Sequence, residues 1–160
     1  MTCLVALRHA RGWILGADAA MVAGSVHTHG IKIHRRGTVW LACAGSVRAT
    51  GAFLDRCIHR SRPKDLARWL RSKRPPGEGF AWSAGTLLEW GSEISEVIDY
   101  STSGSGWEIA LGALHALRSQ GSSPASAVVG SLRAAAAHRG DVCAPFSLLS
   151  LPAGVVRTYR

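Results

Sequence analysis

The chain has 160 residues, of which 47% are hydrophobic and 18% are charged, so it can bury a core and is too apolar to be disordered. No apolar run reaches the roughly 20 residues that span a bilayer, and we find no leader of the secretory type. We therefore expect a single domain over residues 1–160, located in the cytoplasm and not bound to membranes.

The first half of the chain changes from strands to helices. Alternating or apolar runs predict strands over residues 3–8, 13–17, 21–26, 31–34 and 39–44, the first two joined by a tight turn at 10–12. In the fourth strand, Ile31 and Ile33 are expected on one face, with Lys32 and His34 on the other. Helical spacing then predicts helices over 47–59 and from Pro63 to about residue 74.

The second half repeats this alternation. Strands are predicted over 80–90 and 94–99, helices over 107–119 and 124–138, and strands over 142–151 and 155–159. Ser123 and Pro124 are typical of a helix start. The order fits an α+β fold in four layers, an α-β-β-α sandwich of two antiparallel sheets with a helix pair outside each. A two-layer α+β fold and a β-sandwich with appended helices are the alternatives.

The net charge of +9 and the scattered cysteines and histidines give weaker signals. The basic residues are spread along the chain and are densest from 59 to 74, so a solvated face or a surface for an acidic partner explains them better than nucleic-acid binding. The four cysteines are interpreted as small buried residues, and His27 and His29 alone make a weak metal site. We expect no metal and no cofactor. Four tryptophans (Trp69, Trp82, Trp90, Trp107) either anchor subunit contacts or pack in the core.

The residue after the initiator methionine is a candidate nucleophile. Removal of Met1 would leave Thr2 with a free α-amine, which can accept the proton of the Thr2 hydroxyl. Asp18 and Lys32 follow at spacings that suit two neighbouring strands.

Five segments, in order and over nearly the whole chain, resemble the proteasome β-subunit family, in particular its bacterial branch with HslV and the betaproteobacterial proteasome homologues. The segments are Thr2 with the strands that lead to Gly16-Ala17-Asp18, Gly30 to Arg35, Ala42 to Ser46, Gly104-Ser105-Gly106, and Gly140-Asp141 near the end. The resemblance implies the N-terminal nucleophile hydrolase fold.

The resemblance also implies roles for individual residues. Thr2 would be the nucleophile, Lys32 would favour its alkoxide, and Asp18 would hold Lys32. The Gly45 N–H would stabilise the oxyanion. Further members of the expected site are Ser105 and Asp141, which would bind around the Thr2 amine, and the substrate-binding residues Met21, Cys43 and Ser46. The stretch from Asp18 to Lys32 is about two residues shorter than in HslV, and His34 is the alternative to Lys32 if the alignment contains no such deletion.

The function that the resemblance implies is a threonine endopeptidase that degrades unfolded polypeptides inside a double ring of its own copies. Hexameric and heptameric rings are both possible, seven-fold being favoured, and an ATP-dependent unfoldase is a candidate partner. The alternatives are an N-terminal nucleophile amidase or protein ligase with a specific substrate, and a catalytically silent ring scaffold.

Overall fold

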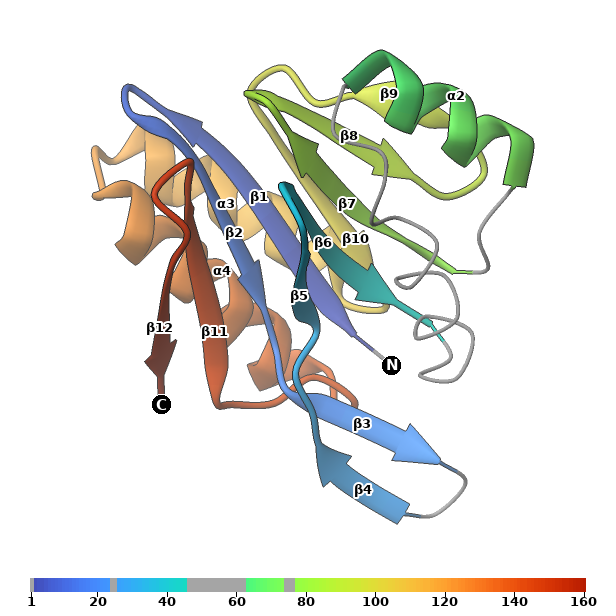
Figure 1. Ribbon diagram of the computed structural model, residues 1–160. Coiled ribbons are helices and arrows are strands. Elements are labelled where there is room, and N and C mark those ends of the chain that lie inside the picture. Colours follow the sequence, from blue (N-terminus) through green and yellow to red (C-terminus); the bar gives the residue numbers. More distant parts are fainter. Residues whose placement is uncertain (1, 24–25, 46–62, 74–76) are drawn as a thin grey trace.

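The protein forms four layers in the computed structural model, which describes residues 2–23, 26–45, 63–73 and 77–160 (Figure 1). Two five-stranded sheets lie face to face, with α3 (Trp107–Ser119) and α4 (Pro124–His138) on one side and α2 (Pro63–Lys73) on the other. This is the expected α+β sandwich. The helix predicted over 47–59 lies outside the described residues, so α2 is the one described helix of its layer.

The first sheet contains both ends of the chain. Its strand order is β10-β1-β2-β11-β12, and every neighbouring pair is antiparallel. The predicted hairpin at the N-terminus is confirmed, because β1 and β2 pair from Leu4 opposite Ala17 to His9 opposite Gly12. The strands are β1 (Cys3–His9), β2 (Gly12–Ala17), β10 (Tyr100–Gly104), β11 (Phe146–Leu151) and β12 (Val155–Tyr159).

The second sheet has the strand order β5-β6-β7-β8-β9. The prediction of one strand over 80–90 is wrong: Ala84 and Gly85 have φ values of 47° and 89°, and this turn folds the segment into the β7–β8 hairpin. The strands are β5 (Ile33–Arg36), β6 (Val39–Ala44), β7 (Glu78–Ser83), β8 (Thr86–Trp90) and β9 (Ile94–Glu96).

The chain segment that links β2 of the first sheet to β5 of the second also differs from prediction. Residues 21–26 were expected to form one strand, but β3 (Ala20–Ala23) and β4 (Val26–His29) form a separate two-stranded ribbon. Ile31 and Ile33 do not share a buried face: Ile31 is 76% exposed, whereas Lys32 and Ile33 are both buried. The reason is that β5 begins only at Ile33, so strand alternation does not apply before it.

Apolar side chains fill each space between layers. Cys3, Val5 and Leu7 of β1 pack toward α3 and α4, while Leu4 and Ala6 pack toward the second sheet. A third cluster joins the second sheet to α2, and it contains the buried Trp69 and Trp90. Of the other two tryptophans, Trp82 is partly buried against the second cluster and Trp107 is 45% exposed.

The helices begin and end where their sequences suggest. Ser123 is the N-cap of α4 and its hydroxyl accepts a hydrogen bond from the Ser126 N–H at 3.2 Å, with Pro124 in the first turn. In the described part of the chain, none of the helices has the length and hydropathy needed to cross a membrane.

Candidate active site

Thr2 lies directly before β1, at the end of the layer between the two sheets. Its backbone nitrogen donates a hydrogen bond to Ser105 Oγ at 3.3 Å, and its carbonyl accepts one from the Ser105 N–H at 2.7 Å. Gly104 has a φ of 93°, and a Cβ there would lie 2.0 Å from the Thr2 carbonyl oxygen. A residue with a side chain would therefore push β10 away from Thr2.

Asp18 and Lys32 form a buried ion pair beside Thr2. Lys32 Nζ donates to Asp18 Oδ1 at 2.7 Å, and the Cys3 N–H donates to the same oxygen at 2.8 Å. Because both groups bind one oxygen atom, the ammonium lies next to the Thr2–Cys3 peptide. The Ala20 N–H donates to Oδ2 at 2.9 Å, which fixes the carboxylate just after the end of β2. The Asp18 side chain is 0% exposed and that of Lys32 is 6% exposed.

Burial and this ion pair shift the pKa values of the groups around Thr2. Burial lowers the pKa of Lys32, and the adjacent Asp18 carboxylate opposes that change. Burial, with the Asp18 charge adding to it, raises the pKa of the Cys3 thiol to about 12, so the thiol beside Thr2 is not ionised at neutral pH. His34, the alternative to Lys32, is half-buried in β5, and its pKa is lowered by burial and by Arg36. Lys32 is the residue that reaches Asp18.

Asp141 joins the site through Ser105. Arg139 Nε donates to Asp141 Oδ1 at 3.0 Å, and Ser105 also forms a hydrogen bond with this carboxylate. The hydrogen bond from Arg139 is the main reason that the pKa of Asp141 is below its usual range; burial opposes it and Ser105 adds to it. A polar chain thus runs from the Thr2 nitrogen through Ser105 and Asp141 to Arg139.

A pocket of about 730 Å³ opens beside Thr2. Gly45 follows the last residue of β6, is exposed, and has a φ of 133°. It lines the pocket together with Ala44, Gly77, Glu78, Gly91, Ser92, Gly104, Ser105 and Trp107. The structure thus brings together Thr2, Gly45 and Ser105 around one cavity, with Asp18, Lys32 and Asp141 behind it.

The three expected substrate-binding residues do not lie on the described walls of this pocket. Cys43 is buried in the cluster between the second sheet and α2. Met21 is half-buried in β3, opposite Thr28, and packs against Gly30. Ser46 lies outside the described residues. Their roles stay predictions.

Among the wall residues that were not assigned to the site from the sequence, Glu78 and Trp107 have the largest side chains. Glu78, at the start of β7, has no motif that marks it, and its place depends on the pairing of β7 with β6. Trp107 follows the Gly104-Ser105-Gly106 segment directly, and this adjacency is a signal for a wall position.

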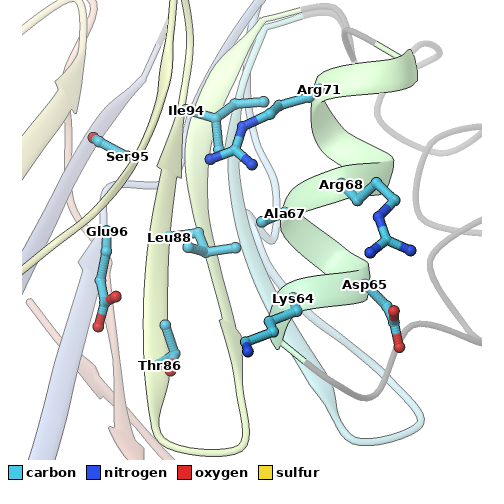
Figure 2. Close-up of a pocket in the computed structure, with 10 residues that line it drawn as sticks. All are labelled: Lys64, Asp65, Ala67, Arg68, Arg71, Thr86, Leu88, Ile94, Ser95 and Glu96. Carbon is cyan, nitrogen blue, oxygen red and sulfur yellow. The ribbon is translucent and has the colours of Figure 1, made fainter.

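A second pocket, of about 1020 Å³, lies between α2 and strands β8 and β9 (Figure 2). Lys64 and Arg71 extend from the helix toward the two strands in Figure 2, and Leu88 and Ile94 contribute apolar surface. The basic residues predicted to cluster here thus line a concave surface, which contains none of the expected catalytic residues.

Comparison with known proteins gives a fold but no sequence family. No protein-family model matches the sequence, and no curated protein matches it. Among solved structures, BPH, the bacterial proteasome homologue of Thiobacillus denitrificans, matches with a TM-score of 0.75 and 16% identity, over 99% of this chain and 98% of that one. The same protein in complex with epoxomicin matches with the same TM-score and identity, over 99% of both chains. Eukaryotic HslV from Trypanosoma brucei matches with a TM-score of 0.77 and 17% identity, over 91% of this chain and 97% of that one.

These matches extend over almost the full length of both partners. The chain has the proteasome β-subunit fold, the four-layer fold of the N-terminal nucleophile hydrolases.

Proposed function

We propose that this chain is a threonine peptidase subunit that cleaves unfolded polypeptides after removal of Met1. The observation that supports it best is the set of groups around Thr2. The Thr2 nitrogen donates a hydrogen bond to Ser105 Oγ. The Lys32 ammonium lies beside the Thr2–Cys3 peptide and is paired with the fully buried carboxylate of Asp18. A pocket open to solvent adjoins the same residue.

The reaction would proceed by acyl transfer. The Thr2 hydroxyl attacks the substrate carbonyl and passes its proton to the Thr2 α-amine, whose pKa near 8 leaves part of it neutral at pH 7. The Lys32 ammonium favours the developing alkoxide, and the Gly45 N–H is the candidate donor to the oxyanion. The C–N bond then breaks as the α-amine returns the proton to the leaving nitrogen. Water then hydrolyses the ester on Thr2, with the same amine as base, and regenerates the Thr2 hydroxyl.

Self-assembly into stacked rings is the second part of the proposal. The fold shared with HslV and the bacterial proteasome homologue supports it. Rings of six or seven subunits, and an ATP-dependent unfoldase that feeds them, are predictions from the resemblance. Mass photometry of the purified 17.0 kDa chain tests the assembly, because a double ring and a monomer differ more than tenfold in mass.

The catalytic proposal is tested at Thr2. Intact-mass analysis should show that Met1 is absent, and wild-type protein should cleave unfolded casein and fluorogenic peptides. Thr2→Ala should abolish both activities while it keeps the assembly. Epoxomicin, which is bound in one of the matching structures, should label wild type and not Thr2→Ala. Cleavage by Thr2→Ala at the wild-type rate would refute the proposal, and retained Met1 with salt-sensitive binding of an acidic polymer would favour the silent scaffold.

A further inference from the structure

Two serines of β10 face the layer between the two sheets. Ser103 pairs with Leu4 and Ser101 pairs with Ala6 of β1, and both of these β1 residues pack in the core between the sheets. Residues directly opposite each other in an antiparallel pair share a face. Ser101 and Ser103 therefore place hydroxyls in the layer that also contains the apolar cluster of Leu4 and Ala6.

Two carboxylates of the second sheet face the same layer. Glu78 pairs with Ala44, and Glu89 pairs with Phe80; Ala44 and Phe80 also pack between the sheets. By the same pairing argument, Glu78 and Glu89 point toward β10. One edge of the interior is therefore acidic, in a chain whose net charge is +9.

These four polar residues line a pocket of about 400 Å³. Glu78 and Trp107 also line the pocket beside Thr2, so the two cavities adjoin along these two side chains. A substrate held at Thr2 would thus extend a neighbouring side chain toward Glu78 and Glu89.

The acidic pocket contains hydrogen-bonding capacity that the described residues leave unused. Ser103 is 3% exposed, and its Oγ has no hydrogen-bond partner among the described residues. Ser101 Oγ donates to Glu89 Oε2 at 2.6 Å. Burial raises the pKa of Glu89, the Ser101 hydrogen bond opposes that change, and the charge of Glu78 adds to it. No ion pair of the described residues engages either carboxylate.

A cation bound in this pocket would account for all of these features. An ammonium or guanidinium group would pair with the two carboxylates, relieve their mutual repulsion, and donate a hydrogen bond to Ser103 Oγ. A neutral or acidic group would leave the carboxylates unpaired in a half-buried site.

From this arrangement we infer that the pocket formed by Glu78, Glu89, Ser101 and Ser103 binds a lysine or arginine side chain next to the scissile bond of the polypeptide substrate. The inference rests on the proposed peptidase function, and it makes the protein selective for basic segments of unfolded chains.

The first test measures substrate preference. Two series of fluorogenic peptides carry lysine, norleucine or glutamate at one position on either side of the cleaved bond, and kcat/KM is determined for each. We expect wild type to prefer lysine to norleucine about tenfold at one position, the low end for a half-buried charge pair. Glu89→Gln should remove most of that preference. Glu96→Gln, which removes the same charge from β9 on the α2 side, should keep it.

The second test measures binding without catalysis. Nα-acetyl-lysine methylamide and its norleucine analogue are titrated by calorimetry into Thr2→Ala and into Thr2→Ala/Glu89→Gln. Charge-selective binding that Glu89→Gln abolishes supports the pocket even if no peptide is cleaved, in which case the peptidase proposal alone fails. Equal binding of both ligands, or cleavage without a basic preference, would overturn the inference. Thermal unfolding of each variant identifies loss of folding as a separate cause.

Discussion

Replacing Asp18 with asparagine removes a charge from the most buried ion pair of the described residues while it keeps the size of the side chain. Asp18 Oδ1 accepts from Lys32 Nζ and from the Cys3 N–H, and Oδ2 accepts from the Ala20 N–H at 2.9 Å and the Cys143 N–H at 3.4 Å. An asparagine has one acceptor oxygen, so its amide nitrogen must face a donor. The Lys32 ammonium also loses its carboxylate in a site that is 6% exposed.

The expected cost follows from these contacts. Removing one partner of a buried ion pair destabilises a protein by about 3–5 kcal/mol. For a domain of this size, each kcal/mol lowers the melting temperature by roughly 2–4 °C, so Asp18→Asn should melt roughly 6–20 °C below wild type at pH 7. Catalysis should fall as well, because the Lys32 ammonium is no longer held beside Thr2.

The matched measurement is a double-mutant cycle with Lys32→Met. If the pair acts as one unit, Asp18→Asn/Lys32→Met should be more stable than Asp18→Asn alone, since it leaves no uncompensated charge. Urea denaturation followed by circular dichroism at pH 7 gives the four free energies of unfolding. A loss below about 1 kcal/mol in Asp18→Asn, or strictly additive single losses, would refute the electrostatic reasoning.

Three further predictions concern the neighbours of Thr2. Gly104→Ala should cost more than about 2 kcal/mol in urea denaturation, because its Cβ would meet the Thr2 carbonyl; Gly121→Ala, also at positive φ but with nothing within 4 Å, is the matched control and should cost only about 1 kcal/mol. Ser105→Ala removes a hydrogen-bond acceptor from the Thr2 nitrogen, so the amine pKa should fall and the acid limb of the kcat/KM profile should move to lower pH; an unmoved limb would contradict the contact. Asp141→Asn should be less stable than wild type at pH 7. Because the pKa of Asp141 is lowered by Arg139, that difference should persist above the ordinary pKa near 3.9 and disappear as pH falls through the lowered value; a difference that is independent of pH would argue against the ion pair.

Local signals made part of the fold predictable. The β1–β2 hairpin follows from two apolar runs and a turn between them, and α4 follows from the Ser123 cap and Pro124. The β7–β8 hairpin was missed because apolar residues continue on both sides of Ala84-Gly85. The strand β10 was missed for a different reason: Tyr100 to Gly104 is polar, and its strand form depends on pairing with β1, about a hundred residues away.

The candidate site likewise contains residues that the sequence marks and residues that it does not. Asp18 and Lys32 were assigned together through the resemblance; the structure shows their direct ion pair, while their catalytic roles stay predictions. The acidic pocket had no sequence signal, because Glu78 and Glu89 belong to different strands and meet Ser101 and Ser103 of the other sheet. Such a group becomes visible only when strand registers in both sheets are known.

The pairing of β1 with β10 positions both the nucleophile and the acidic pocket. Alternation along β1 directs Cys3 and Val5 to the helices and Leu4 to the second sheet, and Thr2, the residue before the strand, lines the pocket with Gly45 and Ser105. The pairing of Leu4 with Ser103 sets the face of β10 as well. A slip of one residue in this pairing would turn either the side chains of β1 or the two serines of β10 to the opposite face. Gly104 restricts this pairing to one arrangement, since only a residue without a Cβ fits against the Thr2 carbonyl. The strand pairing that places Thr2 at its pocket therefore also places Ser101 and Ser103 in the cavity proposed to select the substrate.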